Sequence, residues 1–318
     1  MNALVLGCAY AMDLLVGDPE WFPHPVRAIG RMIATGESVA RPGRHPPVRD
    51  LLAGAVVTAI VVVATAAVAV LSLRAARRIH PGVAWLAEGL LAWTVLATGS
   101  LLAEASRVIQ ALDAGDLASA RTRLARIVGR DTNTLTEPEI ARAVIETVAE
   151  STCDGIVAPL CYLVAGGVPA ALAYKAVNTL DSMIGHRDPP YTYFGRIAAR
   201  LDDLANFVPA RLAALAITMA AACTGQSAAG AWRVWRRDHA KHDSPNAGHP
   251  EAAMAGALGV TLGGTNYYDG VAIAKPLLAA GGVQPTIAVA RAACRMVLAA
   301  SLITVGTALL IEFVSAGR

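Results

Sequence analysis

Long apolar runs separated by arginine-bearing loops dominate the chain. The run Leu51–Leu73 contains no charged residue and is followed by three arginines within 74–78. A membrane-spanning helix needs about 20 consecutive apolar residues, so this run predicts a span. Val83–Ala103 predicts a second span, which begins after a helix stop at His80-Pro81-Gly82. The two runs together predict a transmembrane hairpin.

Further uncharged runs predict more spans. They cover Gly155–Tyr174, Leu212–Trp232 and Met296–Ile311, whereas Met1–Gly17 is a weaker candidate because it is short and contains an aspartate. Gly166-Gly167-Val168-Pro169 interrupts the first of these runs, which favours a kinked span or a re-entrant hairpin. The expected fold class is therefore an all-α, polytopic membrane helical bundle with about five or six spans.

Composition supports the membrane assignment. Hydrophobic residues make up 55% of the chain, charged residues only 16%, and mean hydropathy is +0.49. Soluble domains carry about 25% charged residues. These values exclude a disordered protein, a nucleic-acid-binding domain and a disulfide-stapled scaffold. We expect a single domain over 1–318, with the hairpin region in 34–127 and the polar motifs concentrated in 128–270.

The arginine distribution gives an orientation. Five arginines lie in the loop 18–50 and six in 103–142, although the short turn 74–82 is also basic. Cytoplasmic loops of membrane proteins are enriched in Lys and Arg. We therefore expect a multi-pass protein of the cell's cytoplasmic (inner) membrane, with both long loops and the active site facing the cytoplasm.

A first polar motif follows a predicted helix start at Thr136. Glu146, Glu150 and Asp154 are spaced by four residues and share one helix face. Carboxylates on one face repel each other, so a Mg²⁺ ion, an arginine or a ligand ammonium should offset them. The alternative is a solvated polar face, which the apolar sequence directly after Asp154 disfavours.

A second motif combines carboxylates with a carboxamide. Asp202 and Asn206 share a helix face, and Asp203 stands beside them. This donor set suits a hard cation, but ion pairs with Arg200 explain it equally simply. The DDxxN pattern also occurs loosely in prenyl-transferring and phosphoalcohol-transferring membrane enzymes.

Histidines define two further motifs. His239, His242 and His249 lie within one polar segment, where they could act as general bases or bind phosphate; an ordinary polar loop is the alternative, and zinc-site spacing is lacking. The segment 17–27 is stiffened by prolines around His24 and suits a ligand wall. A membrane-interface role for Trp21 and Phe22 is the alternative there.

Two weaker features complete the polar inventory. One is a polar run from Asn178 to Arg187 at the end of an apolar stretch. The other is the glycine-rich segment 262–270, which has neither a Walker A nor a GxGxxG pattern. It suits close backbone approach to a large ligand or a plain turn.

Taken in order, these motifs resemble the CobD/CbiB family, the adenosylcobinamide-phosphate synthases of cobalamin biosynthesis. The resemblance rests on GDPEWFPHPVRAIGRMI (17–33), VGRDT (128–132), ETVAESTCDGIVAPL (146–160), AVNTLDSMIGHRDPPYTYFGRIAARLDDLANFVPARL (176–212) and HDSPNAGHPEAAMAGALGVTLGGTNYY (242–268). One departure is Ser151-Thr152-Cys153, where the family often has Asn-Thr-Ser.

The resemblance implies an ATP- and Mg²⁺-dependent amide ligase. Its substrates would be the corrinoid adenosylcobyric acid and (R)-1-amino-2-propanol O-phosphate, or free aminopropanol, and its product adenosylcobinamide phosphate. Trp21, Tyr267 and Tyr268 could flank the corrin ring. We expect the bilayer to be its other partner, no nucleic acid, and an association with other cobalamin-pathway enzymes or with itself.

On this resemblance the site residues fall into three groups. Catalytic roles are expected for Glu146, Glu150, Asp154, His24, His242 and His249. Substrate or phosphate contacts are expected from Arg27, Arg130, Asp131, Asn178, Asp181, Arg187, Arg196, Arg200, Ser244, Asn246 and Tyr267. Metal ligands are expected to be Asp202, Asp203, Asn206, Glu150 and Asp154.

Other functions fit parts of the pattern. A Mg²⁺-dependent membrane prenyl or phosphoalcohol transferase could use the two acidic motifs. A transporter could use the Gly166–Pro169 break as its binding-site helix, although its two halves show no internal symmetry. A structural subunit that holds pathway enzymes is a further alternative, and it is compatible with catalysis.

Overall fold

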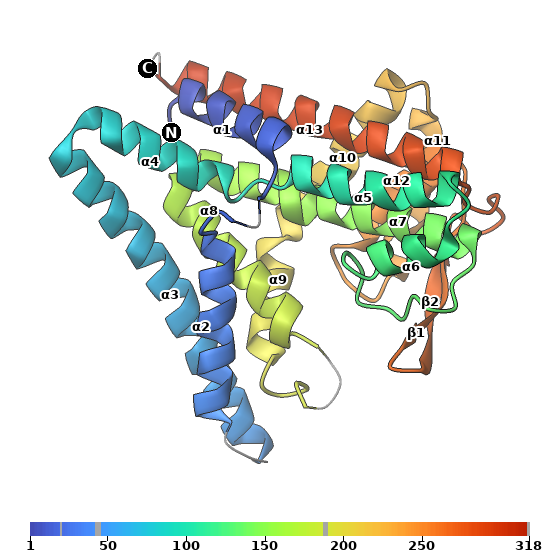
Figure 1. The fold of residues 1–318 in the computed structure, drawn as a ribbon, viewed down its shortest axis with the longest axis horizontal. Helices are drawn as coiled ribbons and strands as arrows, with labels where there is room; N and C mark the ends of the chain where they lie inside the picture. Colours follow the sequence, from blue (N-terminus) through green and yellow to red (C-terminus); the bar gives the residue numbers. More distant parts are fainter. Residues whose placement is uncertain (20, 42–45, 187–189, 317–318) are drawn as a thin grey trace. The chain divides into compact units, whose positions relative to one another are not determined.

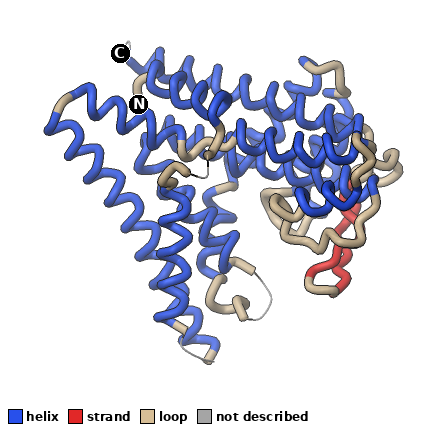
Figure 2. Tube along the Cα trace, viewed as in Figure 1, coloured by secondary structure: helices blue, strands red, loops and turns tan. Residues whose placement is uncertain are grey.

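A computed structural model describes residues 1–19, 21–41, 46–186 and 190–316. Most of this described chain is helical, and its one sheet has two strands (Figures 1 and 2). The chain divides into two compact units. Unit 1 contains Met1–Ala97, Ala158–Asn206 and Thr307–Arg318, and unit 2 contains Thr98–Val157 and Phe207–Gly306. The units are interleaved in sequence, and a single domain over 1–318 stays a prediction.

Unit 1 is built around long apolar helices. Its helices are α1 (Ala3–Val16), α2 (Pro25–Ala40), α3 (Pro47–Ile79), α4 (Pro81–Trp93), α8 (Ala158–Ile184) and α9 (Arg196–Ala205). Ile33, Leu180 and Phe194 are fully buried members of one core cluster. Backbone passes close to Gly54, where an added Cβ would lie 1.8 Å from the Phe194 carbonyl oxygen.

Unit 2 carries most of the polar motifs. Its helices are α5 (Thr98–Asp113), α6 (Leu117–Leu124), α7 (Glu137–Thr152), the π-helix η1 (Cys153–Val157), α10 (Phe207–Cys223), α11 (Ala228–Asp238), the 3-10 helix η2 (His239–Lys241), α12 (Gly248–Leu258) and α13 (Ile287–Ala316), whose last residues belong to unit 1. Helices α11 and α12 meet at Gly230 and Gly256. An added Cβ at either would lie within 2.4 Å of the other's carbonyl oxygen.

A short hairpin completes unit 2. Strands β1 (Leu262–Tyr268) and β2 (Val271–Leu278) pair antiparallel, with Tyr268 opposite Val271. The turn residues Asp269 and Gly270 both have positive φ, 49° and 77°, which is the backbone of a tight two-residue hairpin. The burial of β1 alternates around its centre: Thr265 and Tyr267 are exposed and Asn266 is buried. The hairpin therefore turns Asn266 inward.

The described residues include four helical segments long and apolar enough to cross a membrane. They are Pro47–Ile79, Pro81–Asp113, Glu137–Ile184 and Ile287–Ser315. A fifth exists if α9 and α10 together form one span. The all-α polytopic architecture is therefore confirmed, with four or up to five candidate spans in the described residues against the expected five or six.

Local helix signals explain where the predicted runs succeed and fail. The stop after α3 is confirmed, since His80 ends that helix and its Nδ1 accepts the Gly82 N–H that opens α4. The break in α8 is confirmed at Gly166 and Gly167. An unbroken span over Leu212–Trp232 is wrong: α10 ends at Cys223, and Ser227 caps a new helix through the Gly230 N–H.

Candidate functional site

The predicted helix start at Thr136 is confirmed and positions the first acidic motif. The backbone N–H and the hydroxyl of Thr136 both donate to Glu139, at 2.8 and 2.7 Å, a capping arrangement that fixes the first turn of α7. The helix then carries Arg142 and Glu146 one turn apart. Its α-helical period ends at Cys153, where the π-helix η1 begins. Asp154 thus lies in a π turn, outside the four-residue spacing that the sequence suggested.

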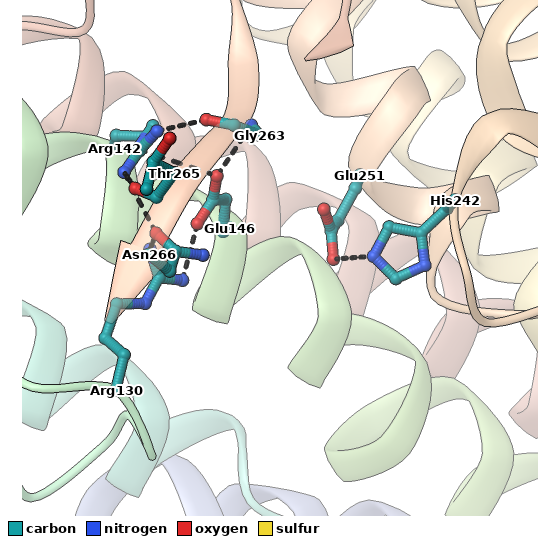
Figure 3. Close-up of polar contacts among 8 residues, drawn as sticks. All are labelled: Arg130, Arg142, Glu146, His242, Glu251, Gly263, Thr265 and Asn266. Carbon is teal, nitrogen blue, oxygen red and sulfur yellow. Dashed lines mark hydrogen bonds and ion pairs between the residues drawn. The ribbon is translucent and has the colours of Figure 1, made fainter. Parts of the chain in front are cut away.

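Glu146 is the centre of a buried ion pair. Its Oε2 accepts from Arg130 Nη2 at 2.5 Å, and both side chains are 7% exposed. Its Oε1 accepts the Gly263 N–H of β1 at 2.8 Å, and Arg142 Nε lies 3.9 Å from the same oxygen. The positive partner expected for this carboxylate is therefore an arginine contributed by a distant segment (Figure 3).

Asn266 joins the two arginines of this site. Its Oδ1 accepts from Arg130 Nη1 at 2.9 Å and from Arg142 Nη2 at 3.0 Å. Arg142 also donates to the carbonyl oxygens of Gly263 and Thr265 (Figure 3). The hairpin and α7 are thereby locked together around two guanidinium groups. We call Arg130, Arg142, Glu146 and Asn266 the arginine–glutamate cluster.

Asp131 holds the other end of the hairpin. Its backbone N–H donates to the Tyr267 carbonyl at 2.8 Å, and its Oδ2 accepts the Gly270 N–H at 2.8 Å. The segment containing Arg130 and Asp131 therefore packs against the turn end of the hairpin. Tyr267 is 44% exposed, so it is accessible to a ligand.

A second buried pair lies in the same unit. His242 Nε2 is 3.6 Å from Glu251 Oε1, and the two side chains are 11% and 8% exposed (Figure 3). Burial, together with the negative charges of Glu150 and Glu146, raises the pKa of Glu251 well above its ordinary value. Burial lowers the pKa of Lys275, but Tyr268 and these glutamates outweigh that effect and raise it. Lys275 therefore stays charged beside the acids.

The candidate histidines share one arrangement. His24 Nδ1 accepts the Val26 N–H at 3.2 Å, and His242 Nδ1 accepts the Ser244 N–H at 3.0 Å. His249 Nδ1 accepts the indole N–H of Trp235 at 2.8 Å. Each neutral ring therefore carries its proton on Nε2.

Their titration follows from burial. Burial is the largest cause that lowers the pKa of His24 and of His242. Burial, followed by the positive charge of Arg211 and the nearby His239, lowers the pKa of His249 to about 4. His249 also stacks on His239 with ring centroids 4.5 Å apart. It is therefore neutral and structurally engaged at pH 7.

Ser244 and Asn246 lie in the turn before α12. The Ser244 hydroxyl oxygen accepts the N–H groups of Asn246 and Ala247, at 3.2 and 3.1 Å. Asn246 is buried. The turn thus presents His242 toward α12, and substrate contacts from Ser244 and Asn246 stay a prediction.

The predicted metal residues of unit 1 contact one another. Asn206 Nδ2 donates to Asp202 Oδ2 at 3.0 Å, and its Oδ1 accepts from the Tyr174 hydroxyl at 2.9 Å. Asp203 lies 3.8 Å from Arg200, which is 73% exposed. The Asn206 side chain is thus held by Asp202 and Tyr174, and metal binding by these residues stays a prediction. Within the described ranges no group of three or more His, Cys, Asp or Glu could hold a metal.

The remaining predicted residues of unit 1 are distributed over three segments. His24 caps α2 and lies 3.7 Å from Asp18, and Arg27 donates to the Phe22 carbonyl. Asn178 and Asp181 lie on α8, and Arg196 begins α9. Arg187 lies outside the described residues. The ligand contacts expected of these residues stay predictions.

Comparison with known proteins identifies the family. The family described as CobD/Cbib protein matches residues 6–297. The chain belongs to the CobD/CbiB family. A relative from Geobacter metallireducens, named "Cobalamin biosynthesis protein CobD", is 50% identical over 87% of this chain and 86% of its own length. A relative from Salmonella typhimurium, "Cobalamin biosynthesis protein CbiB", is 45% identical over 91% and 90%. No solved structure matches the chain.

The sequence of this CobD/CbiB chain did not predict several residues that shape the site. Arg142, Glu251 and Asn266 were not among the expected site residues, and Asp238 was not either. Asp238 is fully buried, pairs with Arg237 and Lys241 at 2.7 Å each, and accepts the Ala279 N–H at 2.8 Å. The hydrogen bonds donated by the Arg237 guanidinium are the main reason that the pKa of Asp238 is held below its ordinary value. The sequence signal around Asp238 is a run of charged residues next to an apolar helix. The same pattern is typical of solvated loops, so it does not identify a buried residue.

Proposed function

We propose that this protein is the amide ligase that joins adenosylcobyric acid to (R)-1-amino-2-propanol O-phosphate, giving adenosylcobinamide phosphate. The observation that carries the proposal is the concentration of buried ionisable groups in unit 2: Arg130, Arg142, Glu146, Glu251 and His242. Buried charges are costly and cluster where chemistry needs them. The family's "cobalamin biosynthesis" names support a corrinoid substrate.

The reaction needs an anion-binding group and a proton acceptor. Amide formation makes a C–N bond between the substrate carboxyl carbon and the amine nitrogen, breaks the C–O bond to the activated oxygen of that carboxyl group, which leaves, and releases a proton from the amine. We assign proton acceptance to Glu251, with His242 Nε2 beside it as the group that orients and stabilises the carboxylate. The raised pKa of Glu251 makes its carboxylate a stronger proton acceptor than an ordinary glutamate. Arg130 and Arg142 would balance the negative charge of the substrates.

This assignment changes the roles expected of the histidines. His242 stays in the site, but its Nδ1 is occupied by the Ser244 N–H, so we assign it a supporting role. His249 is bonded to Trp235 and buried against His239, which favours a structural role. His24 belongs to unit 1, and its catalytic role stays part of the proposal only through the resemblance.

ATP and Mg²⁺ enter the proposal through the family resemblance. When bound, ATP would supply the phosphoryl group that turns a carboxylate oxygen into a leaving group, with Mg²⁺ balancing the phosphate charge. Glu150 on α7 and Asp154 in η1 would be the carboxylates toward the metal, because Glu150 is exposed and Asp154 half-buried. A metal role for Asp202, Asp203 and Asn206 has less support, because the Asn206 side chain already contacts Asp202 and Tyr174.

The alternatives receive less support. The hypotheses of a prenyl or phosphoalcohol transferase and of a transporter depend on motifs that also belong to the CobD/CbiB pattern. The family match covers those motifs within 6–297, and the relatives' names concern cobalamin. We further propose a cytoplasmic-membrane location with the site facing the cytoplasm, where association with pathway enzymes or a second copy is compatible with catalysis.

A corrinoid assay tests the function. Detergent-purified protein is incubated with adenosylcobyric acid, aminopropanol phosphate, ATP and Mg²⁺, and the condensed product is sought by mass spectrometry. We expect product only in the complete mixture, and a loss of at least about 100-fold in rate for Glu251→Gln. Free aminopropanol replaces its phosphate in a parallel arm to identify the amine donor. Turnover of a lipid diphosphate without corrinoid product would favour the transferase instead.

A further inference from the structure

Asn266 has a buried amide donor that the protein itself does not satisfy. The residue is 1% exposed. Its Oδ1 accepts two hydrogen bonds, from Arg130 and Arg142. Its Nδ2 is buried and has no hydrogen-bond partner among the residues that the structure describes. An unsatisfied buried donor is costly, so the position calls for an acceptor from outside the chain.

The orientation of this amide is fixed by its neighbours. Exchanging the oxygen and nitrogen would place the two Nδ2 hydrogens against two guanidinium groups, which are themselves only donors. The oxygen therefore faces the arginines, and the N–H₂ group faces away from them. Figure 3 shows Asn266 between Arg130 and Arg142, beside Glu146.

The surrounding charge selects the kind of acceptor. Within the arginine–glutamate cluster two guanidinium groups face one carboxylate, that of Glu146. An ammonium group would find donors and positive charge here, whereas an oxygen anion would complete the hydrogen bond and offset the excess charge. The flanking residues Thr265 and Tyr267 point to the opposite, exposed face of the strand, so Asn266 alone of the three turns toward the cluster.

We propose that Asn266 is a substrate-positioning residue whose Nδ2 donates to an oxyanion, a phosphoryl or carboxylate oxygen, on the side of the amide opposite the Oδ1 that accepts from Arg130 and Arg142. The chemical identity of that oxyanion rests on the proposed function, because the amine donor carries a phosphate and the corrinoid carries a carboxyl group. The presence of the oxyanion site itself can be tested without any ligation.

Asn266→Asp is the decisive variant. The aspartate keeps an acceptor for both arginines but replaces the N–H₂ donor with an oxygen that repels an anion. The probes are inorganic phosphate and acetate, and the readout is thermal stabilisation of the purified protein in detergent over a concentration series. We expect one probe to stabilise the native protein, and its apparent Kd to rise at least about tenfold in Asn266→Asp.

Two further variants keep the test open to refutation. Asn266→Leu removes the donor without adding charge and should show the same loss of probe binding, so it substitutes if the aspartate variant does not fold. Thr58→Val is the matched control. It removes a buried hydroxyl in α3 of unit 1 that also lacks a hydrogen-bond partner in the described chain, and it should leave probe binding unchanged.

The outcomes separate the possibilities. Stabilisation by phosphate but not acetate identifies a phosphoryl site, and the reverse identifies a carboxylate site. Equal probe binding by native and Asn266→Asp protein overturns the proposal, as does a native protein that responds to neither probe. A loss of probe binding in Asn266→Asp supports the oxyanion site even if the corrinoid assay yields no product, so the two failures are distinguishable.

Discussion

The polar residues of the two units are organised in opposite ways. In unit 2 the arginine–glutamate cluster joins residues from three distant segments, the loop before α7, α7 itself and β1, and nearly every member is buried. In unit 1 the acidic motif is local. Asp202 contacts Asn206 one turn away, and Asp203 faces the exposed Arg200 on the same helix. The buried charges of unit 2 cannot exchange their protein contacts for water, whereas the exposed pair of unit 1 can.

The energetic consequence is large. Removing one partner of a buried ion pair leaves an uncompensated charge and costs about 3–5 kcal/mol, whereas an exposed pair contributes about 0–1 kcal/mol. Mutations of similar chemistry should therefore have very different effects in the two units.

The largest effect is expected for Glu146→Ala. The change leaves Arg130 without its carboxylate and the Gly263 N–H without its acceptor, and we expect a loss of about 3–5 kcal/mol in the free energy of unfolding. Thermal or denaturant unfolding in detergent measures it. Glu146→Gln is the matched control, because it keeps an acceptor for Gly263 and should cost less. Equal stability of Glu146→Ala and native protein would show that the cluster is solvated.

A smaller, pH-dependent effect is expected at His249. The folded pKa of about 4 lies below the ordinary value of 6.5, so the unfolded chain binds the proton more tightly. The contribution of His249 is fully present above pH 6.5 and is lost as the pH falls toward 4. We expect the native protein to lose about 1 kcal/mol of stability between pH 6.5 and 5.5 that His249→Gln does not lose.

Unfolding curves of both proteins at several pH values measure this difference. Glutamine retains an acceptor for the Trp235 indole but does not titrate, so the comparison isolates the ring's protonation. Parallel curves for the two proteins over the whole range would mean that the histidine is accessible to water.

Sequence reasoning succeeded where the signals are local. The helix stop at His80, the capping at Thr136 and the glycine break at Gly166 all follow from backbone rules that act over a few residues. The membrane class follows from the length of the apolar runs. The run 212–232 misled because hydropathy does not register the turn at Gly225, whose φ is +70°.

The site was only half predictable. Arg130, Glu146 and His242 could be identified as chemistry-bearing residues, but their partners Asn266 and Glu251 lie 136 and 9 positions away in sequence. Contacts between residues of different elements produce no regular spacing in the sequence, so spacing cannot predict them. Conversely, the spacing of Asp202 and Asn206 is real, but the structure uses it for an internal hydrogen bond. Spacing alone cannot distinguish a metal ligand from a partner of its own neighbour.

The smallest stability effect is expected for Asp203→Asn. Because Arg200 is 73% exposed and 3.8 Å away, breaking this ion pair should change the free energy of unfolding by less than about 0.5 kcal/mol. The variant therefore reports on function without the confounding loss of fold that Glu146→Ala brings. Arg200→Ala removes the same ion pair from its other side and is the matched control. If Asp203→Asn abolishes ligation at unchanged stability while the Mg²⁺ requirement shifts to higher concentration, the local motif of unit 1 acts on the metal despite its internal contacts. If both variants ligate at the native rate, the motif is a solvated helix face, and the chemistry belongs to the buried groups of unit 2.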